Sequence, residues 1–303
     1  MPAKLIVWLL ALRPKTLSIS VIPVIVGSTL GWLQSGQLSI SVMLAALLAA
    51  MLIQIGTNLH NDAADHVNGT DDPATRVGPP RAVAQGWLSA GQVERAALGS
   101  FMLAFVIGLY LIGVGGWPIL VLGLLSIAAG YCYSGGPWPI ARSGFGEVFV
   151  LLFFGIVAVS GSAYLQAAQF TPVAVLCGLL LGLPAGAVLV VNNHRDRDSD
   201  ARAGRNTLAV HYGPRASLYL YALGVLGPFA ILPLVQHLTV ATPVYYLPWL
   251  LVVWAARLLH RFAHISKAQA FNSLLAETGL FQLILGLLLS LALVAGRSLA
   301  IAH

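Results

Sequence analysis

Nine apolar runs in this chain are each long enough to cross a lipid bilayer. A helix rises 1.5 Å per residue, so about 20 residues span the roughly 30 Å hydrocarbon layer. The mean hydropathy is +0.85 and only 9% of the residues are charged, which is typical of a membrane protein. The sequence therefore predicts an all-α polytopic membrane protein with nine transmembrane helices. The expected spans cover residues 17–34, 40–59, 96–113, 117–133, 146–165, 171–192, 215–236, 243–262 and 273–295.

The basic residues predict how these spans are oriented. With nine spans, fifteen of the 16 Lys and Arg residues fall on one side of the membrane, and Arg297 alone falls on the other. Basic connections face the cytoplasm in most membrane proteins. We therefore expect a cytoplasmic amino terminus, an external carboxyl terminus and any chemistry of the charged residues on the cytoplasmic side. Topology explains the arginines, and no nucleic-acid module is recognisable.

Two groups of aspartate are unusual in so apolar a chain. They contain seven of the 10 acidic residues, and both lie at expected cytoplasmic helix ends. Neighbouring carboxylates repel one another and resist burial. Solvated helix ends would accommodate them, but a divalent cation would remove the repulsion. The first group is Asp62, Asp65, Asp71 and Asp72, and the second is Asp196, Asp198 and Asp200.

Spacing along a helix aligns several of these side chains. Residues four apart lie on the same face. In the first group this spacing pairs Asn58 with Asp62 and Asn61 with Asp65, and Gly69 then breaks the helix. We expect all four side chains to share one face.

The second group repeats the pattern with Asn192, Asp196 and Asp200 in line. The sequence Asn-x-His-x-Asp occurs at 58–62 and again at 192–196, an offset of 134 residues. This suggests an internal duplication within a single domain of residues 1–303, with two half-sites facing one cavity. His60 and His194 are expected to be structural or to contact the ligands.

Oxygen donors of this kind suit Mg²⁺, which takes one or two carboxylates and completes its shell with water and substrate phosphate. We expect two ions, one for each half-site, and a diphosphate between them. The four aspartates Asp62, Asp65, Asp196 and Asp200 are the candidate catalytic residues. The expected metal ligands are Asn58, Asp62, Asp65, Asn192, Asp196 and Asp200.

Basic and hydroxyl side chains near the two groups are candidates for binding that diphosphate, although each basic residue is equally explained by membrane orientation. Arg81 and Arg205 stand out because glycine or proline precedes them, and such turns fold a loop back over a site. Tyr133 is either an interfacial anchor or a hydrogen-bond donor to phosphate. The candidates are Lys15, Arg76, Arg81, Tyr133, Arg142, Arg195 and Arg205.

Together these segments resemble the UbiA superfamily of intramembrane prenyltransferases, and within it the bacterial 1,4-dihydroxy-2-naphthoate branch. The similarity extends over nearly the whole chain. A third aspartate expected at 69 is replaced by Gly69, which the naphthoate branch shares. The segments that carry the resemblance are 12–16, 58–71, 76–81, 133–147 and 192–213.

The resemblance implies Mg²⁺-dependent transfer of a polyprenyl group from polyprenyl diphosphate to 1,4-dihydroxy-2-naphthoate. Loss of CO2 and diphosphate would give demethylmenaquinone, and Glu147 would orient the aromatic substrate. Acceptors such as 4-hydroxybenzoate or haem stay open, as do the prenyl chain length and the oligomeric state. A transporter is the alternative from another class, but transporters tend to place ionisable groups near the bilayer midplane.

Overall fold

The computed structural model describes residues 3–69, 76–137, 139–239 and 243–301, and the described chain is helical with no strand. Seven helical segments are long and apolar enough to cross a membrane. They are α2 (Pro14–Ser35), α3 (Ile40–Val67), α4 (Ala90–Gly115), the run Gly146–Ala167, α8 (Pro172–Arg202), α9 (Leu208–Leu238), and the run Ala268–Gly296, most of it in α11 (Phe271–Ile301).

Two further expected spans correspond to shorter or divided helices. The apolar helix α5 (Trp117–Cys132) has 16 residues. The region 243–262 divides into a 3₁₀ helix, η3 (Pro243–Leu251), and α10 (Val252–His264). Proline cannot donate a backbone hydrogen bond, and Pro243 and Pro248 both lie in the 3₁₀ part. The structure thus establishes seven membrane-length helices and leaves the total of nine a prediction.

The run Gly146–Ala167 is one continuous path with a widened centre. It consists of α6 (Gly146–Leu151), a π-helical turn η2 (Leu152–Val157) and α7 (Ala158–Ala167). The π turn packs against α8, where Gly155 lies so close to the backbone of Gly178 and Gly182 that a Cβ would collide with it. Small residues allow this close approach of helices. Turns of this type are frequent at functional sites.

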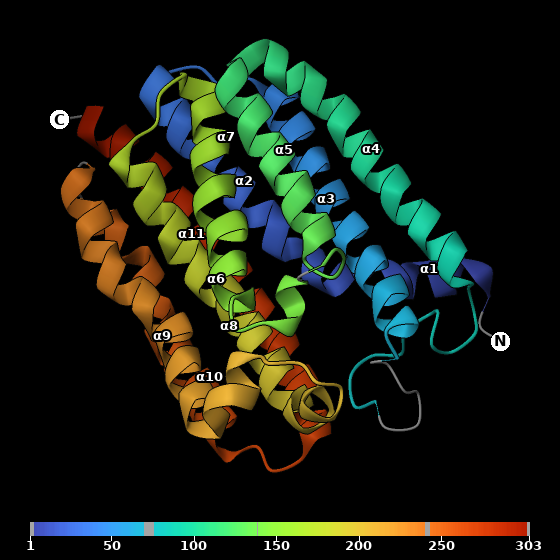
Figure 1. The fold of residues 1–303 in the computed structure, drawn as a ribbon. Coiled ribbons are helices and arrows are strands. Elements are labelled where there is room, and N and C mark those ends of the chain that lie inside the picture. The colour runs from blue at the N-terminus through green and yellow to red at the C-terminus, as the bar shows by residue number, and fades with distance from the viewer. Residues whose placement is uncertain (1–2, 70–75, 138, 240–242, 302–303) are drawn as a thin grey trace.

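The helices form one bundle whose connections alternate between two ends (Figure 1). The longer connections, α3 to α4, α5 to α6, α8 to α9 and α10 to α11, lie together at one end. The first helix, α1 (Lys4–Leu12), lies at this end and across the direction of the long helices. Since α3 and α8 both finish here, their aspartates meet at the same end of the bundle.

Candidate active site

A cavity of about 460 Å³ lies between the helices. Its wall is polar where α3 and α8 end, and it becomes apolar toward the far ends of α4 and α5. The apolar part includes Leu111, Ile112, Ile119 and Leu165. One end therefore suits a charged or polar group, and the rest suits a hydrocarbon chain.

The α3 side of the polar end is formed by Asn58, Asn61 and Asp65. The Asn61 amide donates to the Asp65 carboxylate at 3.0 Å. Arg81 also donates to Asp65 at 3.1 Å, and both side chains are 9% exposed. Of the two predicted pairs with a spacing of four residues, Asn61 and Asp65 therefore both line the cavity.

Asp62 occupies a different place from its predicted partners. It is 2% exposed and is absent from the cavity wall. Its carboxylate accepts the backbone N–H of Ala82 at 3.0 Å and that of Val83 at 3.4 Å. These bonds fasten the chain after Arg81 to α3. In this structure Asp62 therefore supports the loop that carries Arg81.

The α8 side presents all three predicted residues, Asn192, Asp196 and Asp200, to the cavity. Arg195 donates to both carboxylate oxygens of Asp196, at 2.8 and 2.6 Å. The same guanidinium donates to the Asn192 amide oxygen at 2.8 Å. One arginine therefore neutralises Asp196 and orients both side chains.

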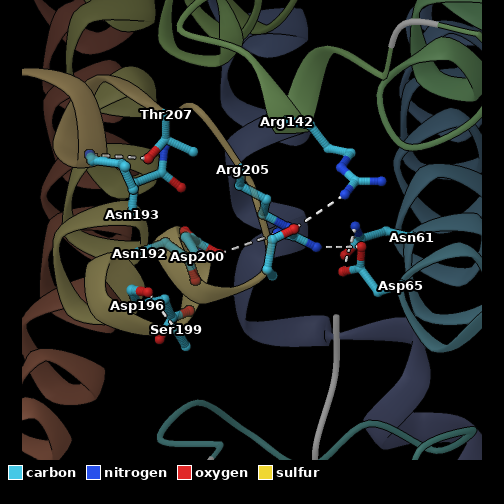
Figure 2. Close-up of polar contacts among 12 residues, drawn as sticks. Asn61, Asp65, Arg142, Asn192, Asn193, Asp196, Ser199, Asp200, Arg205 and Thr207 are labelled. Carbon is cyan, nitrogen blue, oxygen red and sulfur yellow. Dashed lines mark hydrogen bonds and ion pairs between the residues drawn. The ribbon is translucent and has the colours of Figure 1, made fainter. Parts of the chain in front are cut away.

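Arg205 joins the two sides (Figure 2). Its guanidinium contacts Asp65 of α3 and lies 3.6 Å from an oxygen of Asp200 on α8. All three side chains are at most 15% exposed. The two predicted half-sites thus face each other across a single cation.

The donors around the cavity match the preferences of Mg²⁺, which favours carboxylate and amide oxygens. Among the described residues, no three His, Cys, Asp or Glu side chains lie close enough to hold a metal. Each carboxylate here is instead paired with an arginine. A metal ligated by Asp65, Asp196 or Asp200 would therefore compete with a guanidinium for the carboxylate oxygens.

The other predicted residues are distributed unevenly. Arg76, Arg81, Arg195, Arg205 and Tyr133 line the cavity. Lys15 is exposed and lies outside its wall. Arg142 donates to the backbone oxygen of Ala203 at 3.2 Å and so supports the loop that carries Arg205. Asp198 is exposed and paired with Arg197, and Asp71 and Asp72 lie outside the described residues.

Tyr133 follows the last residue of α5 and reaches the cavity. Burial raises the pKa of its hydroxyl above the ordinary value, and the negative charge of Glu147 adds to the shift. The hydroxyl therefore keeps its proton at neutral pH and is a hydrogen-bond donor.

Sequence spacing did not single out three further residues at this end. Arg13 adopts a left-handed backbone conformation, with φ of 55°, between α1 and α2. It donates to Asn61 at 3.2 Å. Asn193 donates to the buried Glu147 at 2.9 Å, and Asn272 contacts Arg195 at 2.7 Å. A non-glycine residue with positive φ is uncommon and often functional, but it is invisible in the sequence.

Comparison with known proteins identifies relatives along the whole chain. The model of the UbiA prenyltransferase family matches residues 20–278. The "1,4-dihydroxy-2-naphthoate octaprenyltransferase" of Escherichia coli is 40% identical over 233 residues, which are 75% of each chain. The protein of the same name from Haemophilus influenzae is 33% identical over 97% of each chain.

Solved structures show the same fold. A UbiA homolog from Archaeoglobus fulgidus, bound to GPP and Mg²⁺, superposes with a TM-score of 0.67 at 15% identity, covering 94% of this chain and 99% of the homolog. The apo UbiA homolog from Aeropyrum pernix gives a TM-score of 0.66 at 16% identity, covering 95% and 99%. The chain therefore belongs to the UbiA prenyltransferase family and is a prenyltransferase.

Proposed function

We propose that this enzyme transfers a polyprenyl group from polyprenyl diphosphate to 1,4-dihydroxy-2-naphthoate, with loss of CO2 and diphosphate. The observation that carries the proposal is the cavity, which joins a charged end at Asp65, Asp196 and Asp200 to a long apolar wall. Relatives at 33% and 40% identity are named for this acceptor. The product of the transfer would be demethylmenaquinol, the reduced form of demethylmenaquinone.

The polar end would hold Mg²⁺, as two ions, through cavity-facing oxygens. Asn61 and Asp65 would serve on α3, with Asn58 beside them, and Asn192, Asp196 and Asp200 would serve on α8. Bound there, the metal would neutralise the charge of the departing diphosphate. The internal duplication at an offset of 134 residues, which relates Asn58 to Asn192 and Asp62 to Asp196, stays a prediction from the sequence.

The protein's own groups would then bind and shield the reactants. Arg81 and Arg205 would interact with the diphosphate as charged donors, and the Tyr133 hydroxyl would add a neutral one. The prenyl tail would lie along the apolar wall, where each buried CH2 contributes about 0.8 kcal/mol. Such a wall excludes water, which would otherwise react with the allylic carbon. That carbon would instead bond to the electron-rich naphthoate ring as its bond to the diphosphate oxygen breaks.

Loss of the naphthoate carboxylate as CO2 would restore the aromatic ring. The transfer involves no net oxidation or reduction. It therefore needs no oxidant, only the two substrates and the metal. We place the active site at the cytoplasmic face of a bacterial inner membrane, with the carboxyl terminus outside. The distribution of basic residues supports this orientation.

The test compares two acceptors. Membranes containing the protein would be supplied with a polyprenyl diphosphate, Mg²⁺, and either 1,4-dihydroxy-2-naphthoate or 4-hydroxybenzoate. We expect prenylated naphthoate and one CO2 for each transfer. Prenylation of 4-hydroxybenzoate with its carboxylate retained would refute the acceptor assignment.

A further inference from the structure

Arg195 lies fully inside the polar end of the cavity, with its side chain 1% exposed. Its Nε and Nη2 atoms bind Asp196, and Nη2 also binds Asn192. These two partners lie on its own helix. The remaining nitrogen, Nη1, points to another element and donates to the Asn272 amide oxygen at 2.7 Å.

Asn272 stands in the first turn of α11 and uses both ends of its amide. While Oδ1 accepts from Arg195, Nδ2 donates to the backbone oxygen of Val77 at 3.1 Å. The two partners require opposite ends of the amide, which fixes its orientation. One side chain therefore joins α8, α11 and the segment that contains Val77.

The segment 76–81 passes over the polar end of the cavity, and most of its residues line the wall. Gly78 lies directly against the guanidinium, since a Cβ at this position would be 2.8 Å from Arg195 Nη2. Arg76 Nε donates to the Pro79 backbone oxygen at 2.7 Å and closes the turn. The segment ends at Arg81, which binds Asp65.

We propose that Asn272 is a positioning residue that ties the segment 76–81 to Arg195 and thereby aligns both with the diphosphate-binding end of the cavity. The inference rests on the proposed function for its substrate. One arm of Asn272 holds the guanidinium across Asn192 and Asp196, and the other holds the segment closed beside it. These contacts do not require a bound metal, because both hydrogen bonds of Asn272 join protein groups.

The contacts set the expected effects. A hydrogen bond to a charged group is worth roughly 1.5 to 3 kcal/mol, or about tenfold to a hundredfold in an equilibrium constant. Removal of the Arg195 arm should raise the KM for polyprenyl diphosphate by about that factor. The neutral bond to Val77 is weaker, so its loss should open the segment about two- to tenfold more often. The KM for the aromatic acceptor should change less than about twofold, because the tie concerns the diphosphate end.

Three variants separate the arms. Asn272→Ala removes both, and Asn272→Asp keeps an acceptor for Arg195 but loses the donor to Val77. Ser273→Ala is the matched control, because Ser273 contacts Arg261 and the Ala270 backbone on the adjacent part of the chain. We expect the alanine variant to have the largest KM increase for polyprenyl diphosphate, the aspartate variant a smaller one, and the control none.

Limited trypsin digestion of the metal-free, substrate-free protein reads the segment directly. Cleavage after Arg76 is followed by mass spectrometry relative to cleavage after the exposed Arg202. Both Asn272 variants should be cut faster after Arg76 than the wild type. Unchanged cleavage in both would overturn the tie. Equal KM increases in the two Asn272 variants would overturn the Arg195 arm, and the same changes in Ser273→Ala would reduce the effect to general loosening.

Failure of the wild type to prenylate the naphthoate would refute the proposed function. The digestion would still decide whether Asn272 holds the segment, because it requires no substrate.

Discussion

Replacement of Arg205 by glutamine should lower the free energy of unfolding of the metal-free protein and at the same time increase its affinity for Mg²⁺. Arg205 stands between Asp65 and Asp200, and both carboxylates are 9% exposed. Glutamine retains a polar side chain without the charge. Two buried carboxylates would then face each other without the cation that now joins them.

The geometry sets the size of the loss. At the 3.6 Å that separates Arg205 from Asp200, the Coulomb attraction is about 4.6 kcal/mol for an effective dielectric constant of about 20. Desolvation offsets part of that attraction, and removal of one partner from a buried ion pair typically costs about 3 to 5 kcal/mol. We expect a decrease of that order in the free energy of unfolding without metal. A bound cation recovers stability as its concentration exceeds its Kd, by about 2.7 kcal/mol at a hundredfold excess.

The assay is unfolding in detergent with and without Mg²⁺, for the wild type, Arg205→Gln and the control Arg202→Gln. Arg202 is exposed at the end of α8, so its variant should resemble the wild type. In Arg205→Gln, Mg²⁺ should raise the unfolding midpoint more than in the wild type, while turnover falls because a diphosphate contact is lost. An equal or smaller Mg²⁺ effect in Arg205→Gln would refute competition between the arginine and the metal.

Four other substitutions test separate parts of the structure. Asp196→Asn should abolish Mg²⁺-dependent turnover in a folded protein, whereas Asp62→Ala should chiefly lower the unfolding free energy, by about 1 to 3 kcal/mol for each buried N–H left unpaired; turnover and unfolding measured on both variants check this contrast. Tyr133→Phe should lower kcat/KM for polyprenyl diphosphate by about three- to tenfold, and because the pKa of Tyr133 is raised, the wild-type rate should show no loss from this group between pH 7 and pH 9 in a pH profile. Gly155→Val should prevent close packing of the π turn on α8, where a Cβ would already lie 2.6 Å from Gly182, and a lower yield of folded, monodisperse protein would show it.

Much of the fold follows from the lengths of the apolar runs. A membrane imposes a minimum length on a helix, so a run such as 171–192 leaves little alternative to the span within α8. Local winding is less predictable. Leu152–Val157 forms a π turn and Pro243–Leu251 a 3₁₀ helix, yet both are apolar like the α-helices beside them. The π turn packs against Gly178 and Gly182 of α8, and such contacts between helices cannot be read from the composition of either segment.

The site was harder to predict because helical spacing defines a face but does not say what the face meets. At about 100° per residue, Asn58, Asn61 and Asp65 cluster within about 60° around α3, and Asp62 lies about 60° to 100° from the last two. Asn58, Asn61 and Asp65 line the cavity, whereas Asp62 accepts hydrogen bonds from the backbone of Ala82 and Val83. Those loop residues are 20 and 21 positions away, so spacing within α3 carried no information about them.

The arginines explain how the polar end remains stable before a substrate arrives. Three carboxylates of the cavity, Asp65, Asp196 and Asp200, contact three guanidinium groups, and an uncompensated buried charge would cost several kcal/mol. Under the proposed function, two Mg²⁺ ions and a diphosphate ester with about three negative charges would enter together. Their charges nearly cancel, so the carboxylates can turn to the metal while the released guanidinium groups turn to phosphate. In such an exchange every charged group would keep a partner of opposite charge. Mg²⁺ alone or the diphosphate alone would leave some charge in the cavity uncompensated.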